Sequence, residues 1–376
     1  MKKILLVFGT RPEAIKMAPL VKKFKEESAF FDCKVCVTAQ HREMLDQVLQ
    51  WFEISPDYDL NIMRPGQDLY DITANVLSGM KDVLKDYQPD AVLVHGDTTT
   101  SFATALAAFY QQIPVGHIEA GLRTYNLDAP FPEELNRQLT GRMARWHFVP
   151  TSLNRDNLLS EGVKEQNIYL TGNTVIDALY WTTDKIKRQS LSGGNVDQNV
   201  ITVLNDPSIQ TVLVTAHRRE SFGHGFVNIC EALAKLAQTH KNLAIIYPVH
   251  PNPKVKEPVE KYLKDIPNIH LIEPLNYQDF VFVMEAADIV LTDSGGVQEE
   301  APSLGKPVLV MRDVTERVEA LEGGTVELVG TDVKKIVDRI SHYLAPENNF
   351  ISKVNPYGDG KAVQRIVETF KGYFNS

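Results

Sequence analysis

The sequence predicts an α/β protein built from two parallel-sheet halves, and three observations support that prediction. The chain has 376 residues, enough for two domains of typical size. Hydrophobic residues make up 43% of it, so each half can bury a proper core. Short apolar runs alternate with helical patterns, and this alternation is typical of parallel strands joined by right-handed crossovers.

The first half begins with a buried strand over residues 4–8, followed by a helix. Thr10 and Glu13 have the spacing of a capping box, and Pro12 is tolerated in the first helical turn. Apolar residues then recur at helical spacing at Met17, Leu20, Val21 and Phe24. Further strands are expected at residues 34–38, 91–95, 115–119 and 146–149.

The alternation breaks at residues 190–207, a polar, glycine-containing stretch that we interpret as a surface excursion. It restarts with strands expected at residues 212–215, 244–247, 269–272, 289–292 and 308–311. A last helix over residues 361–373 is expected to return to the first half. The predicted domains are therefore residues 1–171 with 358–376, and residues 172–357.

Charge and composition narrow the possible functions. The chain carries 39 Lys and Arg against 48 Asp and Glu, a net charge of -9, whereas nucleic-acid binders are usually basic. The N-terminal segment MKKILLVFGT is too short for a signal-peptide core, and no run approaches a membrane-spanning length. We therefore expect a cytoplasmic protein with neither nucleic acid nor membrane as a partner.

The three cysteines, Cys33, Cys36 and Cys230, are too few for a disulfide scaffold in a chain of this length. Cys33 and Cys36 read C-x-x-C, but they lie in an expected strand on opposite faces, and no second cysteine pair exists. A redox or zinc role is therefore disfavoured.

Neither common nucleotide fingerprint is present. No strand is followed by G-x-G-x-x-G, and Gly305-Lys306 lacks the P-loop spacing. We therefore expect neither a tightly bound NAD nor P-loop phosphoryl transfer. Polar residues at strand ends remain, which is where open α/β sheets bind ligands.

The first strand ends in GTRPEAIK, which places Arg11 and Lys16 beside a helix N-terminus. A helix N-terminus offers free N–H groups and a positive dipole end, so the pair could clamp an anion. The alternative is two solvated cations on a surface helix.

Two neighbouring strands end in a histidine followed two residues later by a carboxylate. HGDTTTS contributes His95 and Asp97, and GHIEAGLRT contributes His117 and Glu119, which we expect to share one face. Paired carboxylates for proton transfer are one interpretation and a metal site is another. Asp97 alone could instead cap the following helix.

A third acidic motif, PFPEELNR, opens a helix with Glu133 and Glu134. Acidic residues are common in a first helical turn, so this motif alone is a weak signal.

The second half carries features of an anion site. HRRESFG places His217 at a strand end beside two arginines, although a buried core histidine is the alternative. DSGGVQEEAPSLGKP then places Ser294, Gly295 and Gly296 where a backbone must approach a phosphate. Glu300 follows one turn later, suited to accept two ribose hydroxyls.

The segment MRDVTER adds Arg312 and Arg317 to these basic residues.

Six of these motifs closely resemble those of the non-hydrolysing UDP-N-acetylglucosamine 2-epimerases: GTRPEAIK, HGDTTTS, GHIEAGLRT, PFPEELNR, HRRESFG and DSGGVQEEAPSLGKPVLVMRDVTER. They run in the matching order from residue 9 to residue 317. The resemblance implies a GT-B-like fold, with two Rossmann-like domains and a cleft between them. It also implies a homodimer that acts on UDP-N-acetylglucosamine and UDP-N-acetylmannosamine, with neither NAD nor a metal as cofactor.

The resemblance assigns roles to individual residues. It points to catalysis for Asp97, Glu119, Glu133 and His217. It points to substrate and UDP binding for Arg11, Lys16, Phe280, Ser294, Gly295, Gly296, Glu300 and Arg317. Many relatives are activated by substrate at a second, allosteric site, for which the candidates here are Gln40, Glu43 and Arg64. Leu275 departs from the pattern, because some relatives carry a polar residue there that touches the base.

The expected reaction explains these residue types. The C2 proton of the sugar is not acidified by a carbonyl, so expelling UDP while a base removes that proton offers a route through 2-acetamidoglucal. The departing diphosphate needs cations and N–H donors, and inversion at C2 needs proton transfer on both faces. The carboxylates are not assigned to individual faces. The product is expected to supply cell-surface polysaccharide biosynthesis.

Three alternatives remain open: a GT-B glycosyltransferase that uses a UDP-sugar donor, a hydrolysing epimerase, and a nucleotide-sugar-binding regulator without turnover. A pure binder of a diphosphate is disfavoured, because it would not turn carboxylates toward its ligand.

Overall fold

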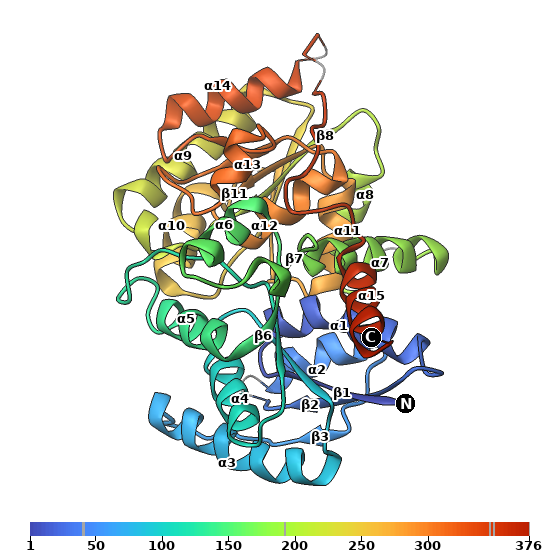
Figure 1. Cartoon of the computed structure of the whole chain (residues 1–376). Coiled ribbons are helices and arrows are strands. Elements are labelled where there is room, and N and C mark those ends of the chain that lie inside the picture. The colour runs from blue at the N-terminus through green and yellow to red at the C-terminus, as the bar shows by residue number, and fades with distance from the viewer. Residues whose placement is uncertain (40–41, 192, 346, 349, 376) are drawn as a thin grey trace. The chain divides into compact units, whose positions relative to one another are not determined.

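The computed structural model describes residues 1–39, 42–191, 193–345, 347–348 and 350–375, which form two compact units (Figure 1). Unit 1 comprises Met1–Ala178 and Tyr357–Ser376, and unit 2 comprises Leu179–Pro356. The first division falls at 178/179, whereas the sequence analysis places it at 171/172. Helix α7 (Thr174–Arg188) runs through the division without a break, so no local sequence signal marks it.

Unit 1 is built on a seven-stranded parallel sheet with the order β3-β2-β1-β4-β5-β6-β7. Its strands are β1 (Lys2–Phe8), β2 (Phe31–Val37), β3 (Tyr58–Asp59), β4 (Ala91–His95), β5 (Val115–Ile118), β6 (Ala144–Val149) and β7 (Ile168–Leu170). The five strands that the sequence predicts are confirmed. The two that it misses, β3 and β7, are short edge strands without a readable period.

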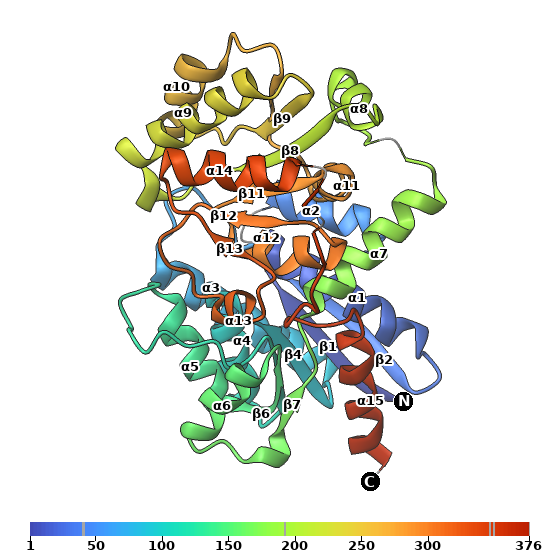
Figure 2. The same cartoon turned by 90° about the horizontal axis from the view of Figure 1, so that it is seen from above.

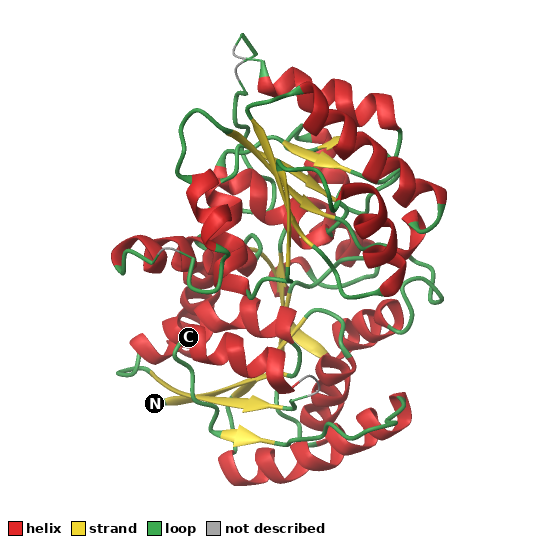
Figure 3. Ribbon diagram, turned by 180° about the vertical axis from the view of Figure 1, so that it is seen from behind, coloured by secondary structure: helices red, strands yellow, loops and turns green. Residues whose placement is uncertain are grey.

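Helices flank the strands of each unit (Figure 3). In unit 1 they are α1 (Arg11–Glu26), α2 (Arg42–Trp51), α3 (Leu69–Tyr87), α4 (Thr99–Tyr110), α5 (Glu133–Met143), α6 (Ser152–Ser160), the 3-10 turn Glu165–Asn167, the start of α7, and α15 (Ala362–Asn375). Helix α1 has the predicted capping box between Thr10 and Glu13, and its four predicted apolar residues are buried. That burial anchors the segment that carries Arg11 and Lys16.

The C-terminal helix α15 returns to unit 1, as predicted, and Figures 1 and 2 both place it beside α1. The Phe370 ring lies 5.9 Å from Phe24 and 4.9 Å from Trp146. The N-terminus of α15 is held by the Asp177 carboxylate, which accepts hydrogen bonds from the N–H groups of Ala362 at 3.2 Å and Val363 at 3.1 Å. Aromatic packing and the half-buried Asp177 carboxylate together hold the returning chain in place.

Unit 2 is built on a six-stranded parallel sheet with the order β10-β9-β8-β11-β12-β13. Its strands are β8 (Gln210–Thr215), β9 (Leu243–Pro248), β10 (Ile269–Ile272), β11 (Ile289–Thr292), β12 (Val308–Val310) and β13 (Glu327–Leu328). The five predicted strands are confirmed, and the missed β13 has two residues at the edge. Each sheet begins at its interior and extends to both sides, as in Rossmann-like folds.

The helices of unit 2 are α8 (Gln198–Leu204), α9 (His224–Thr239), α10 (Pro253–Leu263), α11 (Tyr277–Ala286), α12 (Gly295–Glu300), α13 (Val318–Glu322) and α14 (Val333–Leu344), with 3-10 turns at Arg219–Ser221 and Ala301–Leu304. Helix α8 corrects the interpretation of residues 190–207 as a plain excursion. Asp197 caps it by accepting from the Asn199 N–H at 2.7 Å, and Val200 and Ile201 are buried. Seven residues are too few for a clear helical period.

The sequence also gave expectations about membrane-spanning segments and about the cysteines. No helix in the part of the chain that the structure describes is long and apolar enough to cross a membrane. The thiols of Cys33, Cys36 and Cys230 are free, and Cys36 and Cys230 are buried.

We predict that Asp177→Ala lowers the free energy of unfolding by about 1–2 kcal/mol, because two N–H groups at the start of α15 lose their acceptor. Urea unfolding followed by tryptophan fluorescence, to which Trp146 beside α15 contributes, measures the change. Glu368→Ala on the exposed face of the same helix is the matched control, with an expected effect below about 0.5 kcal/mol. Equal effects of the two substitutions would contradict the role given to Asp177.

Candidate active site

The carboxyl ends of β1, β4 and β5 lie side by side in the sheet of unit 1, so the loops that follow them meet at one edge. Asp97 and Glu119 lie in these loops, and Lys16 lies on helix α1, which follows the first of them. The Lys16 ammonium pairs with the Glu119 carboxylate, and the charges of Lys16, Glu119 and Glu133 all act on Asp97. The structure therefore brings these four residues together. Arg11, the half-buried first residue of α1, begins the helix at the same edge.

Glu119 lies just beyond the end of β5 and has a left-handed backbone, with φ +61°. A non-glycine residue adopts this conformation only uncommonly. Its Oε2 accepts hydrogen bonds from the Lys16 ammonium and, at 2.8 Å, from the Asn173 side-chain amide. The carboxylate is thus held from two directions.

The expectation that His117 and Glu119 share one face of a strand is wrong. The strand ends at Ile118, and the backbone turns at Glu119, so alternation no longer applies. The His117 ring is buried, and its Nε2 bonds to the Gly96 carbonyl at 2.7 Å. His117 therefore supports the loop before Asp97.

Burial lowers the pKa of both histidines at this edge. The pKa of His95 falls to about 4, although Glu119, whose Oε2 lies 3.8 Å from its Nε2, opposes the shift. The pKa of His117 falls to about 3 for the same reason, so both rings are neutral at pH 7. Among the residues that the structure describes, there is no group of three or more His, Cys, Asp and Glu that could hold a metal ion.

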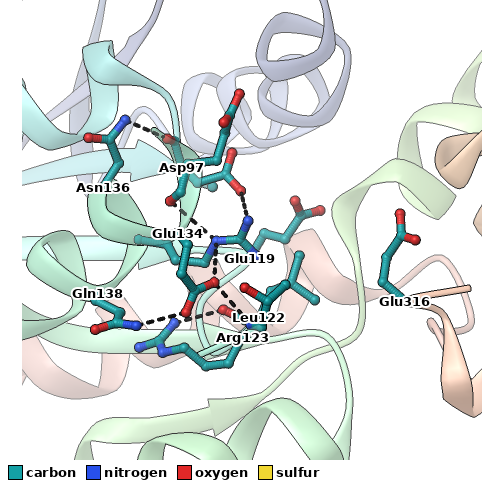
Figure 4. Close-up of polar contacts among 12 residues, drawn as sticks. Asp97, Glu119, Leu122, Arg123, Glu134, Asn136, Gln138 and Glu316 are labelled. Atoms are coloured by element: carbon teal, nitrogen blue, oxygen red, sulfur yellow. Dashed lines mark hydrogen bonds and ion pairs between the residues drawn. The ribbon is translucent and has the colours of Figure 1, made fainter. Parts of the chain in front are cut away.

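Asp97 does not cap α4, which corrects that alternative. The cap is Thr98, whose hydroxyl accepts from the Ser101 N–H at 3.1 Å. The Asp97 carboxylate instead lies 3.2 Å from the Arg137 guanidinium, and the Asn136 amide donates to the Asp97 carbonyl at 3.0 Å (Figure 4). Burial raises the pKa of Asp97 to about 6, while Arg137 opposes that rise.

Helix α5 begins at Glu133, as predicted, and its first turn lies near Asp97. Glu133 is half-buried, whereas Glu134 is fully buried and accepts from the N–H groups of Thr124 at 3.0 Å and Tyr125 at 3.1 Å (Figure 4). Burial raises the pKa of Glu134, but its hydrogen bonds and the nearby Arg137 outweigh burial and lower it overall. Glu134 therefore anchors the preceding loop.

Sequence reasoning misses three residues of this site: Asn136, Arg137 and Asn173. The first two lie in PFPEELNR, and Arg137 follows Glu133 and Glu134 at helical spacing, so a search for a cation one turn after the acids could have found it. Asn173 comes from a distant loop and carries no local signal.

A further carboxylate, that of Glu13, connects two loops of the site. Its buried side chain accepts hydrogen bonds from the Gly9 N–H at 3.0 Å and the Thr10 N–H at 2.8 Å in the first loop. It also accepts from the hydroxyls of Thr98 at 2.6 Å and Ser101 at 3.2 Å after β4. Glu13 thereby fixes the β1–α1 loop against the segment that carries Asp97.

In unit 2 the predicted residues lie at the carboxyl ends of β8 and β11, which are adjacent strands. The buried Asp293 accepts from the backbone N–H groups of His217 and Arg218, both at 2.7 Å. The His217 side chain is 39% exposed and stacks on His250 at 5.5 Å, so the alternative of a buried core histidine is wrong. Burial lowers the pKa of His217, and Asp293 opposes that effect.

Helix α12 begins after Ser294, as predicted, with Gly295 and Gly296 in its first turn. A Cβ at Gly295 would lie 3.2 Å from the Arg317 guanidinium carbon, so a side chain there would crowd Arg317. Arg317 pairs with Glu299 at 2.8 Å and with Glu316 at 2.8 Å.

The remaining candidates of unit 2 lie on α11 and α12. The buried Glu300 accepts from the Tyr277 hydroxyl at 3.1 Å. Phe280 is half-buried on α11, and Leu275 precedes Asn276, the N-cap of that helix.

The candidates for a second site lie elsewhere in unit 1. Glu43 is exposed in the first turn of α2, and Arg64 is exposed in the loop before α3, where its N–H donates to the Gln67 side chain at 2.9 Å. Gln40 lies outside the described residues.

Comparison with known proteins agrees with this architecture. The sequence model of the UDP-N-acetylglucosamine 2-epimerase family matches residues 22–371. The UDP-N-acetylglucosamine 2-epimerase of Escherichia coli K12 is 58% identical over 372 residues, which cover 98% of each chain. A crystal structure of the Neisseria meningitidis UDP-GlcNAc 2-epimerase bound to UDP-GlcNAc is 50% identical with a TM-score of 0.84, covering 98% of this chain and 100% of that one.

A putative UDP-N-acetylglucosamine 2-epimerase from Listeria monocytogenes is 45% identical with a TM-score of 0.91, covering 100% of this chain and 97% of that one. The protein is thus an α/β enzyme of the GT-B-like class with two parallel-sheet domains. It belongs to the UDP-N-acetylglucosamine 2-epimerase family and is an isomerase.

We predict that Glu13→Ala lowers the free energy of unfolding by about 2–4 kcal/mol, because four donors lose a buried acceptor. Denaturant unfolding measures the loss. Glu26→Ala on the same helix removes only an exposed ion pair with Lys23 and should cost less than about 0.5 kcal/mol. A Glu13→Ala protein as stable as Glu26→Ala would rule out the tethering role.

Proposed function

We propose that this protein reversibly epimerises UDP-N-acetylglucosamine at C2 to UDP-N-acetylmannosamine, without NAD or a metal ion. UDP leaves C1 as a carboxylate removes the C2 proton, and 2-acetamidoglucal is formed. Reprotonation on the opposite face and return of UDP complete the inversion. The observation that carries the proposal is the cluster of Asp97, Glu119 and Glu133 in a chain whose relatives are epimerases over their whole length.

The groups of unit 1 suit the proton transfers. Asp97 has a pKa of about 6, so it is able both to give and to take a proton near neutral pH. Glu119 is held between Lys16 and Asn173, and Glu133 acts on Asp97 through its charge. Two carboxylates with different partners can serve the two faces of C2, as an inverting proton transfer requires.

The groups of unit 2 suit the nucleotide. His217 lies at a strand end with its backbone fixed by Asp293. The start of α12 presents Gly295 and Gly296 to a diphosphate, with Arg317 nearby as a cation. Glu300 and Phe280 are the proposed contacts of the ribose and the uracil. Arg11, in unit 1, adds positive charge for the departing UDP.

Further parts of the proposal come from the family resemblance. The enzyme is a cytoplasmic homodimer whose product enters cell-surface polysaccharide biosynthesis. Substrate bound near Glu43 and Arg64 activates it allosterically.

Proton NMR of UDP-N-acetylglucosamine incubated with the enzyme in heavy water, without added NAD or metal, tests the proposal. The expected result is UDP-N-acetylmannosamine with deuterium at C2. Stoichiometric free UDP with N-acetylmannosamine would instead indicate a hydrolysing epimerase. Unchanged substrate would contradict the proposal and favour a glycosyltransferase that needs an acceptor. Asp97→Asn should abolish turnover, and wild-type turnover in that variant would overturn the role of Asp97.

We predict that the pH profile of kcat contains an ionisation near pH 6 that belongs to Asp97. Arg137 lowers the pKa of this carboxyl, so Arg137→Met should move the ionisation of Asp97 in the kcat profile to higher pH by roughly one unit or more. Arg142→Met on the same helix, whose side chain donates to a carbonyl away from Asp97, is the matched control and should leave the profile unchanged. Identical profiles for wild type and Arg137→Met would refute the assignment.

A further inference from the structure

Asn173 lies between β7 and α7 and is almost wholly buried, with 3% of its surface exposed. Its side-chain Oδ1 accepts from the Val175 N–H at 3.0 Å, and its Nδ2 donates to Glu119 Oε2 at 2.8 Å. Its backbone N–H donates to the Tyr357 carbonyl at 2.6 Å. One residue therefore contacts Glu119 and both of the segments at which the chain divides into its two units.

The orientation of this amide follows from its partners. The Val175 N–H can only donate, so the atom facing it must be the amide oxygen, and the NH₂ group must face Glu119. An NH₂ group can only donate, so Glu119 Oε2 must accept. Lys16 donates to the same oxygen. Asn173 is therefore matched to the ionised form of Glu119 and fixes which of its oxygens is engaged.

The backbone beside Asn173 passes close to a second backbone segment. Gly172 and Gly358 have φ +86° and φ +129°, and a Cβ at Gly172 would lie 3.2 Å from the Gly358 Cα and 3.2 Å from the Tyr357 carbonyl oxygen. The two segments thus pass each other in direct backbone contact. Asn173 contacts one segment through its backbone N–H and Glu119 through its side-chain amide.

We propose that Asn173 is a positioning residue for the epimerisation. It keeps the Glu119 carboxylate ionised and fixes its orientation. It also links that orientation to the two segments of the chain, near residues 178 and 357, at which the two units are joined. The inference rests on the proposed function, in which Glu119 transfers a proton.

The decisive variant is Asn173→Asp, which keeps the shape and the acceptor for Val175 but replaces the donor facing Glu119 by a carboxylate oxygen. We expect kcat to fall by about 10- to 100-fold with KM changed less than about threefold. The pH profile of kcat should change, because the substitution places a second negative charge beside Glu119. A purely structural role for Asn173 would leave the pH profile unmoved.

Asn173→Ser is the second variant, because its hydroxyl can still accept from the Val175 N–H but is too short to reach Glu119. It should lose kcat by a similar factor without adding a charge, and thermal unfolding shows whether each variant is folded. Asn268→Ala is the matched control: it removes a side-chain amide that donates to the carbonyls of Ala237 and Leu243 in unit 2, and its kcat should stay within twofold of wild type.

The possible outcomes distinguish failure of the proposed function from failure of the positioning role of Asn173. If the wild-type enzyme does not epimerise UDP-N-acetylglucosamine, the proposed function fails. If the wild type is active and either folded variant of Asn173 keeps kcat within twofold of it, the positioning role is overturned. Loss of kcat in step with loss of thermal stability, and with an unchanged pH profile, would also overturn it.

Discussion

The burial of carboxylates at the carboxyl edge of the unit 1 sheet is the constraint on which the rest of the site depends. Withdrawing a carboxylate from water is costly unless donors surround it, and the buried Glu13 and the half-buried Asp97 and Glu119 each have their own set. Glu13 has two backbone N–H groups and two hydroxyls, Asp97 has Arg137, and Glu119 has Lys16 and Asn173. The conformations of the loops after β1, β4 and β5 follow from these contacts.

The two units use carboxylates at their strand ends for different purposes. In unit 2, Asp293 accepts from two consecutive backbone N–H groups, so it shapes the loop that presents His217. In unit 1, Asp97 contacts a side-chain cation and keeps a pKa of about 6. A carboxylate bound by backbone N–H groups is a fixed support, whereas one balanced between burial and a single cation is suited to exchange a proton.

The sequence predicts the interior strands of both sheets, because continuous apolar runs such as Ala91–His95 and Ile289–Thr292 carry a strong local signal. Edge strands of two or three residues and helix α8 are too short to carry one. Within the site, motifs locate Asp97, Glu119 and His217 because these residues directly follow strands. The partners that set their chemistry come from other elements, as Asn173 does, and local patterns do not reveal such contacts.

The central claim is that the C2 proton is removed as UDP leaves C1, since C2 is not acidified by a carbonyl. The most direct test uses UDP-N-acetylglucosamine labelled with ¹⁸O in the bridge between C1 and the β-phosphorus. Phosphorus NMR of the recovered substrate should show the label spread to the non-bridging β-phosphate positions, because free UDP rotates before it returns. Label retained in the bridge while deuterium enters at C2 would show that the C1–oxygen bond does not break, and would contradict the account.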